Sequence, residues 1–281
     1  MAIDDLARAS DDLERIEVQV LLEAIYQHYG FDFRGYARSS LRRRVRNAVA
    51  AEGVATVLAL LERALHDPDC TERLLLALSV NVSAMFRDPR FFRAFRERAV
   101  PLLRTYPFIR IWQAGCSMGE EVYSLAILLQ EEGLYDRCRI YATDMNEFVL
   151  RRAREGIYPL DVMQKYTANY IAAGGTAAFS DYYTAGYDHA KLRESLREHV
   201  VFSQHNLVSD GVFNEFNVIL CRNVMIYFTQ PLQERVHDLF ARSFAKFGLL
   251  GLGSHESLRL LPSAGDYEPL EAGEKLFRRA H

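Results

Sequence analysis

Ile111-Trp-Gln-Ala-Gly-Cys-Ser-Met-Gly-Glu-Glu-Val-Tyr123 is the stretch that decides the fold of this chain. An apolar run, 109–114, ends at Gly115, and Gly119 follows four residues later, before two carboxylates and an apolar helical pattern. This order predicts a strand, a tight glycine-bounded turn and a helix N-terminus. In such a turn a ligand touches bare backbone and the helix N–H groups point at it. The stretch therefore predicts a ligand-binding site.

A second apolar run, 140–143, ends in Asp144. An acidic residue at the tip of the second strand is placed to accept hydrogen bonds from ribose hydroxyls, which indicates a nucleoside-containing cofactor. The turn holds two glycines instead of the three of a dinucleotide site, and Glu120 and Glu121 would repel a pyrophosphate. Two carboxylates instead suit S-adenosylmethionine, which carries a sulfonium and an α-ammonium but no phosphate. The alternative is that both carboxylates only complement the helix dipole.

The C-terminal half alternates predicted strands with predicted helices. The strands are expected at 109–114, 139–143, 199–204, 217–221 and 248–253, and the helices at 120–132, 146–154, 190–197 and 230–246. This alternation predicts an α/β fold with a doubly wound, mostly parallel sheet. Ligands of such sheets lie at the carboxyl ends of the strands. Because Gly115, Asp144, Asn206 and Arg222 each follow a predicted strand, we expect them to converge on one crevice.

The remaining segments predict the domain organisation. Helical periodicity without strand alternation marks 1–80 as a small all-helical N-terminal domain. Residues 81–108, rich in aromatic residues and arginine, form a linker, and 109–281 form the α/β domain. Within that domain, 158–189 is rich in tyrosine and glycine, which predicts a small inserted subdomain of short antiparallel strands. A long surface loop is the alternative for this insert.

The composition excludes several classes of protein. With 281 residues and a formal net charge of −3, the chain is not expected to bind nucleic acid. No apolar run approaches the ~20 residues of a membrane span, and the acidic N-terminus lacks a signal-peptide core. We therefore expect a cytoplasmic monomer without membrane insertion. The four cysteines and eight histidines show no metal-ligand spacing, so we expect no metal and four buried thiols in a reducing compartment.

One basic segment differs from the rest of this near-neutral chain. Six arginines and no acidic residue lie between Arg34 and Arg46. On a helix, Arg38, Arg42 and Arg46 share one face, with Arg43 beside them. No glutamate is spaced to pair with them along the helix, which favours a surface that docks an acidic partner. An ordinary solvated face is the alternative.

Several segments of the chain together resemble one family. They are Asn81-Val-Ser-Ala-Met-Phe-Arg87, Ala114–Ser124, Tyr141–Asn146, Cys221-Arg-Asn-Val-Met-Ile-Tyr-Phe228 and Gly251–Leu258. Along nearly its whole length the chain is similar to the CheR-type chemoreceptor glutamate methyltransferases. The octapeptide that begins at Cys221 is the most specific match.

The resemblance implies an S-adenosylmethionine-dependent protein-glutamate O-methyltransferase of chemotaxis signal transduction. Such an enzyme methylates glutamates in the acidic helical region of chemoreceptors, forming methyl esters and releasing S-adenosylhomocysteine. The family joins a helical N-terminal domain to a methyltransferase domain that carries a small β-subdomain. The resemblance also implies that the linker 81–108 contributes to the cofactor site.

The resemblance assigns roles to individual residues. The positions that match cofactor-holding residues are Asn81, Ser83, Arg87, Glu121, Asp144, Asn206, Leu207, Arg222 and Asn223, in addition to Gly115 of the turn. Arg87 and Tyr227 match the two residues that act near the transferred methyl group. The positions that match the receptor-docking helix are Arg38, Arg42, Arg43 and Arg46.

Several features depart from the family pattern, and two of them concern the cofactor positions and the insert. Ser83 stands where threonine is usual, which keeps the hydroxyl. In some members the inserted subdomain grips a C-terminal peptide of the receptor, and the Asp181-Tyr-Tyr-Thr stretch does not match that form. The alternative functions are a methyltransferase for another signalling protein, a non-catalytic cofactor-sensing interaction module and a small-molecule methyltransferase.

Overall fold

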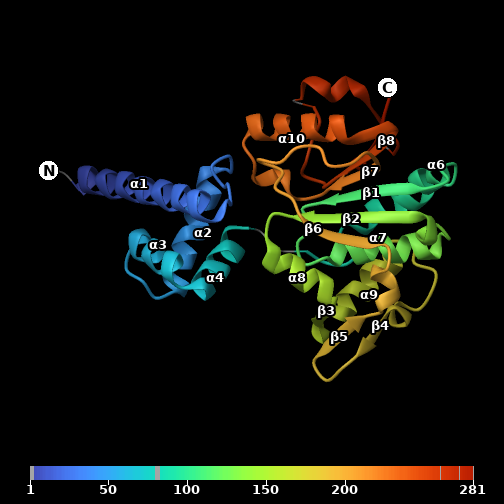
Figure 1. The fold of residues 1–281 in the computed structure, drawn as a ribbon, viewed down its shortest axis with the longest axis horizontal. Coiled ribbons are helices and arrows are strands. Elements are labelled where there is room, and N and C mark those ends of the chain that lie inside the picture. The colour runs from blue at the N-terminus through green and yellow to red at the C-terminus, as the bar shows by residue number, and fades with distance from the viewer. Residues whose placement is uncertain (1–2, 80–82, 260, 272, 281) are drawn as a thin grey trace. The chain divides into compact units, whose positions relative to one another are not determined.

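The computed structural model describes residues 3–79, 83–259, 261–271 and 273–280 (Figure 1). The chain divides into two compact units. The helical unit comprises Met1–Asn81 together with Tyr227–Leu232, and the sheet unit comprises Val82–Ile226 together with Gln233–His281. None of the described helices combines the length and the apolar character that a membrane span requires.

The helical unit is built from α1 (Ile3–Tyr29), α2 (Arg38–Ala51), α3 (Val57–His66) and α4 (Pro68–Leu78). The Thr56 hydroxyl caps α3 and the Asp67 carboxylate caps α4, because each accepts a hydrogen bond from a backbone N–H of the first turn. Apolar side chains of the four helices form the core: Leu21, Ile25, Leu41, Val45, Leu60, Leu74 and Leu78. The prediction of an all-helical N-terminal segment is confirmed.

A short segment from far along the chain completes the helical unit. This segment, Tyr227–Leu232, is called the strap below. Two backbone hydrogen bonds of 2.8 and 2.9 Å join it to residues 35–37. The buried rings of Tyr36 and Phe228 pack edge to face, with their centroids 4.9 Å apart. The strap therefore pairs with the helical unit through both backbone and side chains.

The sheet unit contains a seven-stranded sheet in the order β6-β2-β1-β7-β8-β10-β9. Its strands are β1 (Ile109–Ala114), β2 (Cys138–Asp144), β6 (Val200–Gln204), β7 (Phe216–Cys221), β8 (Phe244–Leu252), β9 (Tyr267–Pro269) and β10 (Leu276–Arg279). The first five strands in this order pair in parallel, whereas β10 runs antiparallel to both of its neighbours. The predicted mostly parallel sheet is confirmed.

Helices cover both faces of this sheet. From residue 83 onward the α-helices are α5 (Pro89–Ala94), α6 (Val100–Leu103), α7 (Glu120–Glu131), α8 (Glu147–Glu155), α9 (Met163–Ala172) and α10 (Gln230–Ser243). Neighbouring residues of a strand point to opposite faces. Accordingly, Trp112 of β1 packs against Phe240 of α10, while Gln113 bonds to Glu121 of α7. Figure 1 shows α10 and α7 on the two sides of the strands.

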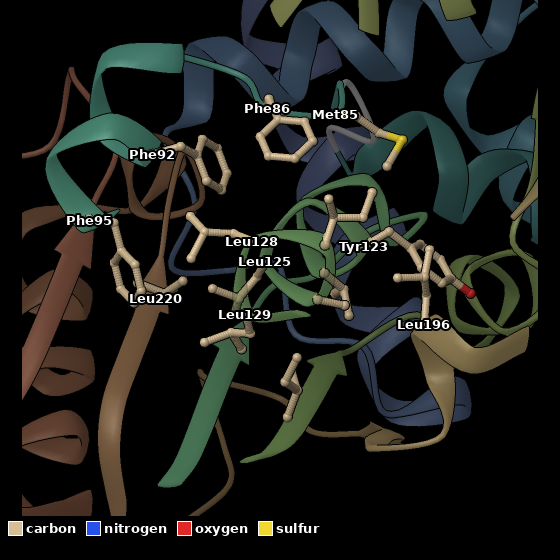
Figure 2. Packing of buried hydrophobic residues seen from close by; sticks show 14 of the residues in the cluster. Met85, Phe86, Phe92, Phe95, Tyr123, Leu125, Leu128, Leu129, Leu196 and Leu220 are labelled. Carbon is tan, nitrogen blue, oxygen red and sulfur yellow. The ribbon is translucent and has the colours of Figure 1, made fainter. Parts of the chain in front are cut away.

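The face of the sheet under α7 carries the main apolar cluster (Figure 2). Phe86 and Phe92, which precede β1, belong to this cluster together with Leu125 and Leu128 of α7. The segment 81–108, expected as a linker, is helical over α5, a π-helical turn at Phe95–Ala99, and α6. Burial of its rings fixes the loop just before α5 on the sheet unit.

A second sheet of three antiparallel strands has the order β3-β5-β4. Its strands are β3 (Ile157–Pro159), β4 (Tyr183–Ala185) and β5 (His189–Leu192), and α9 lies between β3 and β4 in the chain. The predicted small antiparallel sheet is confirmed. The predicted helix at 190–197 is wrong, because β5 and a 3₁₀ turn at Glu194–Arg197 take its place. Ala190 and Leu192 are buried on one face of β5, which is strand alternation.

Candidate cofactor site

The loop between β1 and α7 has the backbone geometry that its glycines predict. Gly115 and Gly119 have φ angles of 73° and 90°, in the left-handed region that favours glycine. A Cβ atom on Gly115 would lie 2.5 Å from the Val224 side chain. The N–H groups of Gly115 and Cys116 both donate to the carbonyl of Thr143 at 2.8 Å. The loop is thereby tied to the end of β2 and kept free of side chains at its first turn.

Asp144 ends β2 and holds the same loop through its side chain. Its two oxygens accept the N–H groups of Ser117 at 2.9 Å and Asn146 at 3.0 Å. Burial raises the pKa of the Asp144 carboxyl, and these backbone donors oppose the rise. The N–H of His205, just after β6, donates to the Asp144 carbonyl at 3.1 Å. The carboxyl ends of β1, β2 and β6 therefore meet here, as the strand pattern predicts.

Arg222 follows β7 and lies at the centre of a buried charge network. Its guanidinium contacts Glu121 at 2.6 Å and Asp88 at 2.9 Å, and only 1% of its side chain is exposed. Gln113 donates to the other oxygen of Glu121 at 2.8 Å, and the centroid of the Phe91 ring lies 4.0 Å from the guanidinium carbon. A buried charge needs such partners, because desolvating it alone is costly. Two predicted cofactor residues, Arg222 and Glu121, thus engage each other in this structure.

Arg87 is anchored through its backbone. Its carbonyl accepts hydrogen bonds from both terminal nitrogens of Arg222, at 3.3 and 3.4 Å. The flanking residues Phe86 and Asp88 have φ angles of 52° and 55°. The N–H of Phe86 donates to the buried Ser124 hydroxyl at 2.8 Å, which holds this loop on α7. The side chain of Arg87 therefore starts from a fixed backbone position beside the Arg222 network.

Glu256 is a residue of this site to which the sequence analysis gave no role. Its carboxylate accepts the N–H groups of residues 223–225 at 2.8 to 3.0 Å and that of Gly253 at 2.6 Å. Burial raises the pKa of Glu256, and the four donors oppose the rise. Glu256 joins the loops after β7 and β8 and supports Asn223 at a φ of 61°. Its place in the closing motif 251–258 was the available sequence signal.

Three further predicted cofactor residues lie in nearby loops of the sheet unit. The Ser83 hydroxyl is a hydrogen-bond partner of Glu120 at the start of α7. Asn206 and Leu207 follow β6, where the Asn206 side chain accepts the N–H of Val208 at 2.9 Å and Leu207 is buried. The predicted Asn81 lies outside the described residues.

Tyr227, the second predicted catalytic residue, is part of the strap and is described with the helical unit. The guanidinium carbon of Arg44 lies 4.7 Å from the centroid of its ring, a cation–π contact. Arg44 is buried and donates to the Ser40 hydroxyl at 3.0 Å. Burial lowers the pKa of Arg44. This arginine of α2, which the sequence analysis did not single out, holds one face of the Tyr227 ring.

The expectation that the arginines of α2 are unpaired is wrong for two of them. Arg42 pairs with Asp11 and with Glu14 of α1, the latter at 2.7 Å, and Arg46 also pairs with Glu14. Their hydrogen bonds hold the pKa of Glu14 down at about 2. The counter-charges come from a neighbouring helix, which spacing along α2 does not reveal. Arg38 and Arg43 are exposed, and neither forms an ion pair with any described residue.

The thiols and acids offer no metal site in the part of the chain that the structure describes. No group of three His, Cys, Asp or Glu side chains there has the geometry to hold a metal ion. Cys70, Cys116, Cys138 and Cys221 are unpaired and buried, as predicted.

Buried polar atoms without partners cluster at the carboxyl edge of the sheet. Ten such side-chain atoms occur in the described residues, and six lie at this edge: Gln113 Oε1, Ser117 Oγ, Glu120 Oε2, Asn146 Nδ2, His205 Nδ1 and Asn223 Nδ2. Buried polar groups normally have partners, so this concentration indicates a site built to receive polar groups of a ligand. The set mixes hydrogen-bond acceptors with amide donors and includes one carboxylate oxygen, that of Glu120. It fits the hydroxyls and ammonium of S-adenosylmethionine better than a phosphate.

The sequence matches two models of one family. The model described as CheR methyltransferase, SAM binding domain, matches residues 81–271. The model described as CheR methyltransferase, all-alpha domain, matches residues 16–79. Together they span both units of the structure.

Curated relatives of similar length agree with the family models. The putative methyltransferase Cher3 of Pseudomonas putida is 49% identical over 94% of this chain and 97% of its own. The chemotaxis protein methyltransferase of Salmonella typhimurium is 30% identical over 84% of this chain and 82% of its own. That of Listeria monocytogenes is 27% identical over 88% and 92%. The chain therefore belongs to the CheR methyltransferase family and uses S-adenosylmethionine as its cofactor.

Proposed function

We propose that this methyltransferase esterifies glutamate side chains in the cytoplasmic helical region of a chemoreceptor. The names of the Salmonella and Listeria relatives, chemotaxis protein methyltransferase, support this role. When bound, S-adenosylmethionine supplies an electrophilic methyl group on a sulfonium, and S-adenosylhomocysteine is the product. The proposal places the enzyme among protein-glutamate O-methyltransferases that act in the cytoplasm as monomers.

The residues that we assign to the cofactor follow from the edge of the sheet. Asp144 is assigned to the ribose hydroxyls, because it ends β2 beside a side-chain-free turn. Gly115 gives the cofactor access to backbone. The methionyl end is assigned to Arg222 and Asn223, which follow β7, with Glu121 beside them. Ser83, Asn206 and Leu207 are assigned to the same cofactor, as is Asn81.

One observation carries the choice of a carboxylate as the substrate. Arg222 already has two carboxylate partners, Glu121 and Asp88, and is assigned to the cofactor, so we do not assign it to the substrate glutamate. Arg87 projects from a backbone that Arg222 itself holds. We assign to Arg87 the orientation of the incoming glutamate by a bidentate contact. Tyr227 remains our prediction for the second residue near the transferred methyl group.

The chemistry needs no general base from the protein. A glutamate side chain has an ordinary pKa of about 4.3 and is already ionised at neutral pH. Burial of the site excludes water, and alignment of the reacting groups contributes roughly 7–11 kcal/mol to such reactions. An arginine that binds the carboxylate too tightly would stabilise the ground state, so orientation is the role that fits Arg87.

Methyl transfer to receptor fragments tests the proposal. The purified chain is incubated with methyl-tritiated S-adenosylmethionine and chemoreceptor signalling fragments, and the release of methanol in base identifies esters. We expect base-labile label that disappears when the receptor glutamates are changed to alanine. Base-stable label, or label confined to another signalling protein, would contradict the proposed substrate.

The role of Arg87 has its own measurement. We expect Arg87→Ala to reduce methyl transfer about a hundredfold or more, with the Kd for S-adenosylhomocysteine changed less than about threefold. Arg87→Lys should recover little, since lysine lacks the bidentate fork. Arg90→Ala, a change of an exposed arginine on α5, is the matched control. Equal losses of transfer and cofactor affinity would show that Arg87 anchors the cofactor instead.

A further inference from the structure

Glu120 is a buried acid at the cofactor loop that the assignments above do not use. It is the first residue of α7, directly after Gly119, and only 5% of it is exposed. The Ser83 hydroxyl is its side-chain partner. Its Oε2 atom has no hydrogen-bond partner among the described residues. A buried acceptor without a donor is costly, and a ligand that brings a donor removes that cost.

No cation among the described neighbours compensates Glu120. Glu121 beside it has the same charge and is itself paired with Arg222. The other titratable groups that face Glu120 are Cys116 in the loop, Tyr158 of β3 and Tyr166 of α9. Burial raises the pKa of all three, so they are neutral near pH 7. The counter-charge for an ionised Glu120 has to come from a ligand.

We propose that Glu120 receives the α-ammonium group of S-adenosylmethionine at its Oε2 atom. The cofactor carries two cations, but the sulfonium has no N–H and cannot donate a hydrogen bond, whereas an ammonium has three donors. A charge-assisted hydrogen bond between ammonium and carboxylate satisfies both the missing donor and the missing charge. This inference depends on the cofactor of the proposed function and not on its protein substrate.

The assignment makes cofactor binding depend on pH. Burial raises the pKa of Glu120 to about 7 in the free protein. An ammonium partner favours the ionised carboxylate. Cofactor binding therefore displaces the proton of Glu120 from each protein molecule in which this carboxyl is still protonated. Below about pH 7 the affinity therefore falls as the pH is lowered, by at most about tenfold per pH unit. Above about pH 7 this dependence levels off.

Titration calorimetry between pH 5.5 and 8 tests the assignment without any protein substrate. Its ligands are S-adenosylmethionine, S-adenosylhomocysteine and 5′-methylthioadenosine, which lacks the ammonium. We expect Glu120→Gln to weaken the binding of S-adenosylmethionine and S-adenosylhomocysteine about 10- to 100-fold and to flatten the pH dependence of both affinities. The affinity for 5′-methylthioadenosine should not change. Glu155→Gln, the same change at an exposed site on α8, should behave as the wild type.

Three results would overturn the inference. If Glu120→Gln weakened the binding of S-adenosylmethionine alone, Glu120 would be assigned to the sulfonium. If it weakened the binding of 5′-methylthioadenosine equally, Glu120 would have a structural role. The third result comes from the wild-type protein alone. Cofactor binding at pH 6.5 is measured in buffers of different ionisation enthalpy, and the absence of proton release would contradict the assignment of Glu120. Receptor methylation is not part of these measurements, so a wrong protein substrate would not affect them.

Discussion

At the scale of single residues, unusual backbone conformations gather at the proposed cofactor site. Five described non-glycine residues have positive φ, and four belong to this site: Phe86, Asp88, Ser117 and Asn223. Each such conformation costs about 1–3 kcal/mol, so the surroundings have to hold it. The N–H of Ser117 is held by Asp144, and that of Asn223 by Glu256. The site is therefore pre-organised before any ligand binds.

A pair of glycine substitutions separates backbone strain from loss of the site. Gly115→Ala and Gly133→Ala both place a side chain at a positive φ, of 73° and 66°, and each should destabilise the fold by about 1–3 kcal/mol. Only at Gly115 would the new methyl group meet a neighbour, Val224, whereas nothing lies within 4 Å at Gly133. We expect only Gly115→Ala to weaken S-adenosylhomocysteine binding, about tenfold or more by calorimetry. Equal cofactor affinity in both variants would refute the role of this turn.

At the scale of elements, the parts of the sheet nearest the cofactor loop were predictable. Observed β1 coincides with the predicted 109–114, and β2, β6 and β7 begin within one residue of their predicted positions. These strands are buried apolar runs bounded by glycine or polar residues, so the local sequence and the final environment agree. The same agreement holds for α7, whose start is fixed by Gly119.

Elements that depend on distant partners were not predictable. Residues 190–197 are mostly good helix formers, yet pairing with β3 and β4 makes their first part a strand. The helix α9 lies in a segment whose tyrosines and glycines suggested only short strands. The short antiparallel strands β9 and β10 exist because β8 supplies an edge. Tertiary contacts decided all three cases.

Within the site, too, some residues were predictable from the local sequence and others depend on distant partners. Asp144 and Arg222 were predictable, because a polar residue after a buried strand points to the carboxyl edge. Asp88 and Glu256 were not, because their partners are a guanidinium 134 residues away and backbone N–H groups about 30 residues away. Arg44 looked like one more arginine of a charged helix. Its contact with Tyr227 depends on the strap, which no local pattern announces.

We predict that Glu256 contributes both to the stability of the loops after β7 and β8 and to cofactor binding. Glu256→Gln replaces one acceptor oxygen by an amide that faces N–H donors, so we expect a loss of about 1–3 kcal/mol in the free energy of unfolding. Because the loop after β7 carries Asn223, S-adenosylhomocysteine affinity should also fall. Denaturant titration and calorimetry measure the two effects. Glu268→Gln, at an exposed position of β9, is the control, and the prediction fails if both variants match the wild type.

At the scale of the whole molecule, we predict that the helical unit docks the protein substrate through its surface charge. Arg42 and Arg46 are already paired with acids of α1, which leaves Arg38 and Arg43 as the arginines of the docking prediction that form no ion pair with a described residue. An acidic receptor helix would be attracted to these two charges, and salt would screen this attraction. The docking contribution should therefore weaken as ionic strength rises.

Charge reversal measures this contribution. We expect the double variant Arg38→Glu, Arg43→Glu to raise the KM for a receptor fragment about tenfold, with kcat and the Kd for S-adenosylhomocysteine unchanged. The double variant Arg235→Glu, Arg242→Glu makes the same change on exposed positions of α10 and is the matched control. If the two double variants have equal KM values, docking does not use α2.

The strap limits how this protein can be divided. The helical unit is not one continuous stretch of chain, because the hexapeptide Tyr227–Leu232 belongs to it. A truncation that removed residues 1–79 would strip the cover from Phe228 and leave two main-chain groups of the hexapeptide unbonded. Chimaeras that exchange N-terminal domains between relatives should therefore carry the hexapeptide with the domain. Separating the helical unit from the sheet unit requires the chain to be divided at three positions instead of one.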